Sequence, residues 1–105
     1  MARIVLALDF EIEAQWLEAI VFAGHEIVER VVGADALIAA VEQHRPDLAV
    51  VQATPETLTA RSLGACDRSG VRTIAVTAST IERQTATSLG VIDRVGADAD
   101  WQRVE

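Results

Sequence analysis

The stretch His44-Arg-Pro-Asp-Leu-Ala-Val-Val-Gln-Ala-Thr-Pro55 decides the fold of this chain. Its centre, Leu48 to Val51, is a short continuous apolar run, which is typical of a strand buried on both faces of a parallel sheet. Pro46 separates this run from the helical pattern before it, because proline is not tolerated within a helix interior. The pair Thr54–Pro55 is typical of a helix start. The stretch therefore predicts the central strand of a sheet, with Gln52 at its carboxyl end.

On both sides of this strand, short apolar runs alternate with helical patterns. Further strands are predicted at 3–8, 25–32, 71–77 and 91–95, and helices at 11–23, 34–45, 54–68 and 79–89. Ser79 and Glu82 have the spacing of a capping box at the start of the last of these helices. A fifth helix is expected to begin at 98–101 and to remain truncated, with one or two turns at most.

This alternation indicates an α/β protein with a parallel five-stranded sheet. The expected strand order is 2-1-3-4-5, that of the flavodoxin-like fold, in which ligands bind at the carboxyl ends of the strands. With 105 residues, the chain has the length of one domain, and we expect residues 1–105 to form it.

Composition excludes several classes of function. The net charge of −7 disfavours nucleic acid as the partner, because binding to its backbone depends on clustered cations. All nine basic residues are arginine, so a P-loop lysine and a Schiff base are both excluded. The single cysteine, Cys66, cannot form an internal disulfide. No apolar run approaches the roughly 18 residues of a spanning helix, and we expect a soluble, cytoplasmic domain with no membrane insertion.

Three segments resemble two-component receiver domains. Arg45-Pro-Asp-Leu-Ala-Val-Val-Gln52 is similar to their Arg-Pro-Asp-Leu-(apolar)₃-Asp segment. The passage from Leu17-Glu-Ala to Gly24-His-Glu-Ile-Val28 resembles the path from their first helix to their second strand, and Val76-Thr-Ala-Ser79 resembles the end of their fourth strand. This resemblance implies a CheY-like fold of three layers.

The resemblance also implies a set of polar groups that this chain has largely lost. A working receiver has two acids after the first strand, an Asp nucleophile ending the third, a Ser or Thr ending the fourth and a Lys ending the fifth. Here Leu8-Asp9 supplies only one of the two acids, and Gln52 stands in the place of the Asp nucleophile. Thr77 supplies the hydroxyl at the end of the fourth strand, and the sequence contains no lysine. Because an amide has neither the charge to bind Mg²⁺ nor useful nucleophilicity, we predict a pseudo-receiver that is not an enzyme and has no phosphoacceptor, metal or cofactor.

The vestigial site is expected at Asp9, Gln52 and Thr77. An alternative for each residue is purely structural, with Asp9 as a helix cap and the other two satisfying loop backbone groups. Two further functional interpretations remain open: a phosphorelay receiver with an unusual acceptor, and a small-ligand sensor whose pocket lies near these residues.

A narrower resemblance is found in the segment from Leu58 to Arg72 and in the tail with Gly-Val-Ile-Asp and Ala-Asp-Trp101. These resemble the N-terminal domain of actinobacterial ParA/MinD-type ATPases, which are related to the CpaE/TadZ proteins of pilus assembly and positioning. The resemblance implies a degenerate receiver that serves targeting and association in front of an ATPase.

We therefore predict a protein-interaction module whose partner is another protein or a second copy, as a homodimer. A truncated fifth helix would leave apolar surface to be covered. The candidate interface comprises Ile81, Leu89 and Trp101. For Trp101, an alternative is that it plugs the edge of the sheet.

Overall fold

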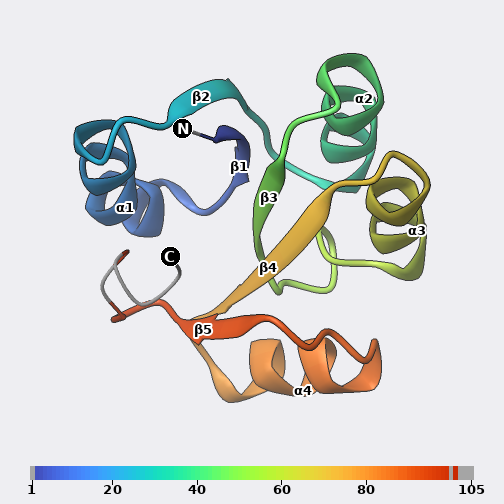
Figure 1. Cartoon of the computed structure of the whole chain (residues 1–105). Coiled ribbons are helices and arrows are strands. Elements are labelled where there is room, and N and C mark those ends of the chain that lie inside the picture. The colour runs from blue at the N-terminus through green and yellow to red at the C-terminus, as the bar shows by residue number, and fades with distance from the viewer. Residues whose placement is uncertain (1, 100, 102–105) are drawn as a thin grey trace.

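The computed structural model describes residues 2–99 and residue 101 and shows a parallel sheet with helices on both faces (Figure 1). The sheet order is β2-β1-β3-β4-β5, so the predicted fold class is confirmed. Within the described residues, no helix is both long and apolar enough to cross a membrane. The elements are β1 (Arg3–Ala7), α1 (Phe10–Phe22), β2 (Glu26–Arg30), α2 (Ala34–His44), β3 (Leu48–Gln52), α3 (Ala60–Arg68), β4 (Arg72–Thr77), α4 (Thr80–Ser88) and β5 (Arg94–Gly96).

Strand β3 is the centre of the sheet, as its apolar run predicts. It pairs in parallel with β1 on one side and with β4 on the other, and all its residues are buried. The strand therefore has no exposed edge, and Gln52 is delivered to the carboxyl end of the sheet with its side chain only 3% exposed.

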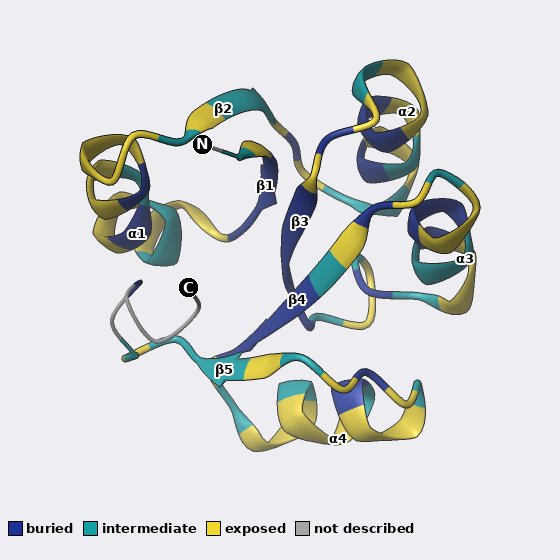
Figure 2. Cartoon of the chain, viewed as in Figure 1, coloured by how far each residue is buried: buried dark blue, intermediate teal, exposed yellow. Residues whose placement is uncertain are grey.

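Two apolar cores lie on opposite faces of the sheet, because successive side chains of a strand point to opposite sides. On the α1 face, Ile4, Leu6 and Val50 pack with Trp16 and Ile20 of the helix. The opposite core joins the strands to α2, α3 and α4, and its members include Val5, Val41, Val51, Cys66 and Ala86. Figure 2 shows the buried residues along the strands and on the inner sides of the helices.

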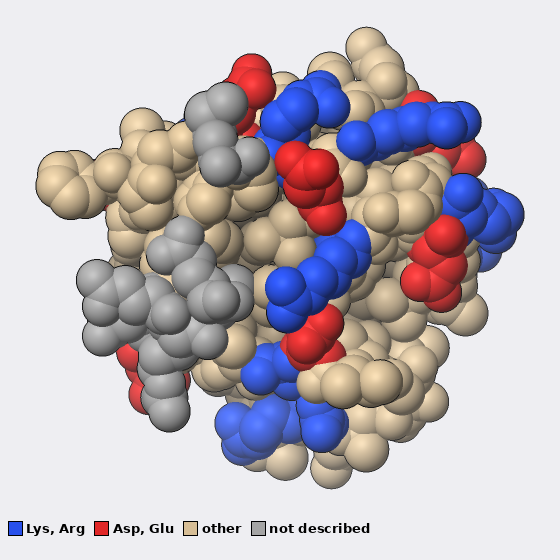
Figure 3. Space-filling model, in the orientation of Figure 1, with Lys and Arg blue, Asp and Glu red and all other residues tan. Residues whose placement is uncertain are grey.

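The amino ends of the five strands carry charges of alternating sign, in the order Glu26, Arg3, Asp47, Arg72 and Asp93. The Arg3 backbone N–H donates to Asp47 Oδ2 at 2.8 Å, and Arg72 Nε lies 3.1 Å from Asp93 Oδ2. Figure 3 shows negative and positive side chains following one another across this face. Opposite charges on neighbouring strands favour this register, although exposed pairs contribute at most about 1 kcal/mol each.

Helix α3 begins at Ala60, and the predicted start at Thr54–Pro55 is wrong. Thr59 caps the helix: its Oγ1 accepts from Ser62 N at 3.1 Å, and its own N–H donates to Ser62 Oγ at 2.9 Å. Residues 55–58 form a turn in which the N–H of Leu58 donates to Thr54 O at 2.9 Å. The turn buries Leu58, and this tertiary contact selects the later start.

The last strand is also shorter and later than predicted, spanning Arg94–Gly96 rather than 91–95. Val91 follows the end of α4 and closes its last turn, since its N–H donates to Ala86 O at 3.1 Å and its side chain is buried in the core. The predicted fifth helix lies outside the described residues, apart from Asp98 and Ala99 in a turn and Trp101.

Candidate functional site

Three polar side chains meet at the carboxyl edge of the sheet, with Gln52 in the middle. Gln52 Oε1 accepts a 2.8 Å hydrogen bond from the backbone N–H of Asp9, and its Nε2 donates at 3.0 Å to Asp9 Oδ2. The same Nε2 donates at 3.0 Å to Glu82 Oε2. One primary amide thus uses both its N–H donors and its oxygen, so its hydrogen-bonding capacity is largely used within the protein.

Each partner of Gln52 stands at the start of a helix. Asp9 is the N-cap residue of α1, directly after β1. Glu82 lies in the first turn of α4, where Ser79 Oγ accepts its backbone N–H at 3.2 Å. Ser79 therefore caps the helix as predicted, but the predicted capping box lacks its reciprocal bond from the Ser79 N–H to Glu82. The Glu82 carboxylate, however, accepts from the N–H of Ala78 at 2.8 Å and from Gln52, and both carboxylates suit the positive end of a helix dipole.

This arrangement is suited to holding elements together. The Gln52 NH₂ group lies within hydrogen-bonding distance of both carboxylates and fills the space between them. A neutral amide supplies donors there but no nucleophilic oxygen of carboxylate strength. Among the described residues, no group of three or more His, Cys, Asp or Glu side chains is placed to hold a metal ion.

A small hollow of about 130 Å³ adjoins this cluster and is lined by Asp9, Gln52, Val31, Thr54 and Thr57 among others. Sites for small organic ligands usually have volumes above roughly 300 Å³. The space beside Asp9 and Gln52 therefore fits water or a very small molecule.

Thr77 does not join the cluster, although the sequence grouped it with Asp9 and Gln52. Its Oγ1 donates to the backbone oxygen of Val95 at 3.3 Å, and it lines a different hollow between α4 and β5. The structure thus brings together two of the three predicted residues and adds Glu82. The signal for Glu82 was its spacing from Ser79, which identified a helix cap and gave no sign of the contact with Gln52.

The predicted interface residues do not form one surface. Ile81 is 64% exposed on α4, and Leu89 is half-buried at the end of that helix. Trp101 is only 5% exposed and belongs to the core on the α1 face, where its ring meets that of Trp16 edge-on at 6.1 Å between centroids. Trp101 therefore packs inside the molecule, as in the alternative in which it plugs the sheet edge.

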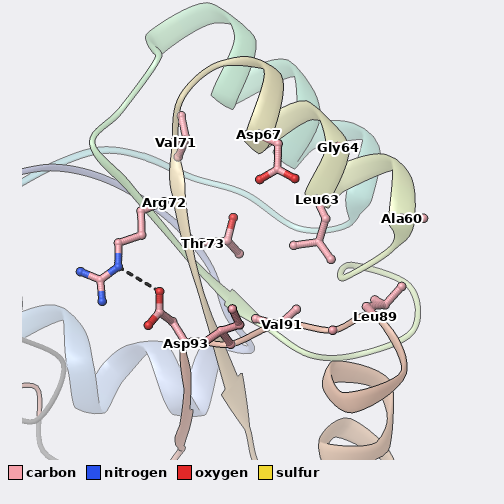
Figure 4. Close-up of a pocket in the computed structure, with 12 residues that line it drawn as sticks. Ala60, Leu63, Gly64, Asp67, Val71, Arg72, Thr73, Leu89, Val91 and Asp93 are labelled. Carbon is pink, nitrogen blue, oxygen red and sulfur yellow. Dashed lines mark hydrogen bonds and ion pairs between the residues drawn. The ribbon is translucent and has the colours of Figure 1, made fainter.

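Ile81 and Leu89 line a groove of about 420 Å³ between α4 and the turn before α3. Leu89 also lines a second hollow of about 500 Å³, which continues toward the amino end of β4. Figure 4 shows Leu63 and Asp67 of α3 on one side of this hollow and Val91 and Asp93 on the other, with the Arg72–Asp93 ion pair at its rim. The groove and this hollow both lie on the side of α4 that faces α3 and the turn before it.

Solved structures of receiver domains have the fold of this chain. The signal receiver domain of NarL from Mycobacterium tuberculosis has a TM-score of 0.74 and 16% identity over 98% of this chain and 89% of that domain. The receiver domain of a modulated diguanylate cyclase from Desulfovibrio desulfuricans G20 has a TM-score of 0.74 and 15% identity, over 99% of this chain and 90% of its own.

A CheY-like receiver domain protein from Methanospirillum hungatei JF-1 is 20% identical, with a TM-score of 0.71, over 97% of this chain and 85% of that one. The chain therefore has the CheY-like fold. No protein-family model matches the sequence, and no curated protein matches it significantly.

Proposed function

We propose that this chain is a cytoplasmic, non-catalytic receiver-like module that acts through protein contacts and is not phosphorylated. The observation that carries the proposal is the Gln52 amide at the end of β3, hydrogen-bonded to the carboxylates of Asp9 and Glu82. A phosphoryl acceptor at this position needs a carboxylate and a bound cation. The amide instead joins the starts of α1 and α4 in a single arrangement.

Incubation of the full chain with acetyl phosphate and Mg²⁺, followed by intact-mass measurement, tests this proposal. We expect no added phosphoryl group, under conditions in which an active receiver domain run in parallel is modified. A stoichiometric phosphoryl adduct on any side chain would instead favour the phosphorelay alternative, and peptide mapping would identify the acceptor.

The proposed partner is a second copy of the chain, and the proposed context is the front domain of a CpaE/TadZ-like, ParA/MinD-type ATPase. The segment Leu58–Arg72, which carries that resemblance, includes α3, and its first two residues, Leu58 and Thr59, line the groove beside Ile81 and Leu89. Ile81 and Ile92 expose 64% and 91% of their surface beside these hollows. A protein partner also suits the net charge of −7 better than a nucleic acid does.

Sedimentation velocity across a concentration series tests self-association of the full chain. We expect a monomer–dimer equilibrium that Ile81→Glu shifts toward monomer, because the substitution places a charge in an apolar contact. Phe22→Glu is the matched control, since Phe22 is 92% exposed on α1 and α1 covers the other face of the sheet. A strict monomer at high micromolar concentration would rule out the homodimer and leave the absence of phosphorylation untouched.

A further inference from the structure

The hollow between α4 and β5 that Thr77 lines is separate from the groove beside Ile81 and from the hollow of about 500 Å³ beside Leu63. It has a volume of about 310 Å³ and is lined by Thr77, Arg83, Thr87, Arg94, Val95 and Gly96. Arg83 and Thr87 come from α4, and Arg94 to Gly96 are the three residues of β5. Among the described residues, no strand pairs with the outer side of β5, so the hollow lies at the edge of the described sheet.

Threonine hydroxyls orient the guanidinium groups of the two arginines that line this hollow. Arg94 Nη1 donates to Thr87 Oγ1 at 2.7 Å, and Thr87 Oγ1 in turn donates to Arg83 O at 2.9 Å. Arg83 Nη2 donates to Thr80 Oγ1 at 2.9 Å. Each guanidinium has five N–H donors, and these contacts occupy only one in each. Both groups are thus oriented while most of their donors remain available.

Neither guanidinium is neutralised by a carboxylate of the described residues. Arg3, Arg30, Arg61 and Arg72 each form an ion pair. The other arginines of the described residues, Arg45, Arg68, Arg83 and Arg94, form none with another described residue, and of these Arg83 and Arg94 line this hollow together. The one acid of α4, Glu82, is turned toward Gln52 and Ala78. Asp98 approaches the hollow at Gly96 but is not paired with either arginine. Figure 3 shows basic side chains gathered where α4 and β5 lie.

We propose that this hollow binds a doubly charged oxyanion of the phosphate class. A tetrahedral dianion has enough oxygens to accept bidentate hydrogen bonds from two guanidinium forks at once, whereas one fork already satisfies a carboxylate. The volume is at the lower end of the range for small-ligand sites. Arg83 and Arg94 share one hollow without an ion pair among the described residues, in a chain whose acids outnumber its arginines by 16 to nine.

Titration of the ¹⁵N-labelled full chain with inorganic phosphate, followed by two-dimensional amide NMR at neutral pH and constant ionic strength, tests the proposal. We expect saturable shifts centred on the amides of Thr77, Arg83, Thr87 and Arg94–Gly96. Arg83→Gln and Arg94→Gln should each weaken the apparent affinity at least about tenfold, because each removes charged donors from the anion. Arg94→Lys, which keeps the charge and loses the fork, should bind with intermediate affinity.

Arg68→Gln is the matched control, because it changes the net charge equally and Arg68 is an exposed residue of α3 outside the hollow. It should leave the affinity unchanged. The absence of saturable shifts, or an equal loss of affinity in Arg68→Gln, would overturn the proposal. Acetate is the second probe at the same ionic strength. Acetate binding as tight as that of phosphate would overturn the assignment to a dianion, and weaker acetate binding would support it.

Discussion

The side-chain amide of Gln52 donates a 3.0 Å hydrogen bond to the carboxylate of Glu82, and this contact joins the end of β3 to the first turn of α4. The same amide reaches Asp9 at the start of α1. Gln52 is almost completely buried, whereas Asp9 is exposed and Glu82 is half-buried, so water reaches the far side of each bond. A side chain that replaces the expected acid therefore has a structural role of its own.

Gln52→Leu should lower the free energy of unfolding by roughly 1–3 kcal/mol, because it leaves the Asp9 N–H without its acceptor and removes one donor from each of the two carboxylates. Urea denaturation of the variant and the wild type measures the difference. Gln43→Leu, an exposed change in α2, should stay within about 0.5 kcal/mol of the wild type. Equal stability of the Gln52 variant would show that the three-residue cluster contributes nothing.

Gln52→Asp should destabilise the protein and make its stability dependent on divalent cations. The substitution replaces two N–H donors with a third carboxylate, and like charges at this distance disfavour the folded state. Mg²⁺ or Ca²⁺ bound by the three oxygen donors would restore stability by mass action. Thermal unfolding with and without each cation measures this effect, and the wild type should show no comparable response.

Thr59→Ala should cost about 1 kcal/mol of stability, within the range measured for helix N-caps. The hydroxyl of Thr59 accepts the N–H of Ser62 at the true start of α3. Thr54→Ala, at the start that the sequence suggested, should change stability by less than about 0.5 kcal/mol. Urea denaturation of the two variants compares the alternatives directly, and a larger loss for Thr54→Ala would contradict the observed cap.

Local signals in the sequence predicted most of the fold because they concern neighbouring residues. Pro46 and the apolar run after it placed β3, and Ser79 placed the start of α4. A Thr-Pro pair suits both a turn and a helix start. The choice at residue 54 depends on the burial of Leu58, which comes from packing between distant segments and leaves no local signal.

The candidate site was predicted only in part for the same reason. Receiver resemblance placed Gln52 and Asp9 at one sheet edge, and the structure brings them together. Glu82 is 30 residues from Gln52 in the chain, and its spacing from Ser79 already had a complete explanation as a cap. The Thr77 hydroxyl bonds to the backbone oxygen of Val95, 18 residues further along the chain, and no local pattern at Thr77 indicates that contact.

Cys66 should react slowly with thiol reagents in the folded protein. Burial raises the pKa of its thiol above the ordinary value of 9.0, so little thiolate forms near neutral pH. The raised pKa also means that folding disfavours the thiolate, and stability should therefore fall as the pH rises past 9.0. Alkylation rates in native and denaturing buffer test the first effect. Urea denaturation between about pH 8 and about pH 10 tests the second, which Cys66→Ala should reduce.

Trp101→Ala should lower the free energy of unfolding by about 3 kcal/mol or more, as expected for loss of a large buried aromatic side chain. Trp101 meets Trp16 edge-on and His25 at 5.6 Å between ring centroids, so its removal opens a cavity beside β1 and α1. Phe22→Ala removes an exposed aromatic ring from α1 and should be nearly neutral. Thermal denaturation gives the stabilities, and sedimentation of the folded Trp101 variant should show the same association as the wild type. Loss of self-association without loss of stability would instead place Trp101 in the interface.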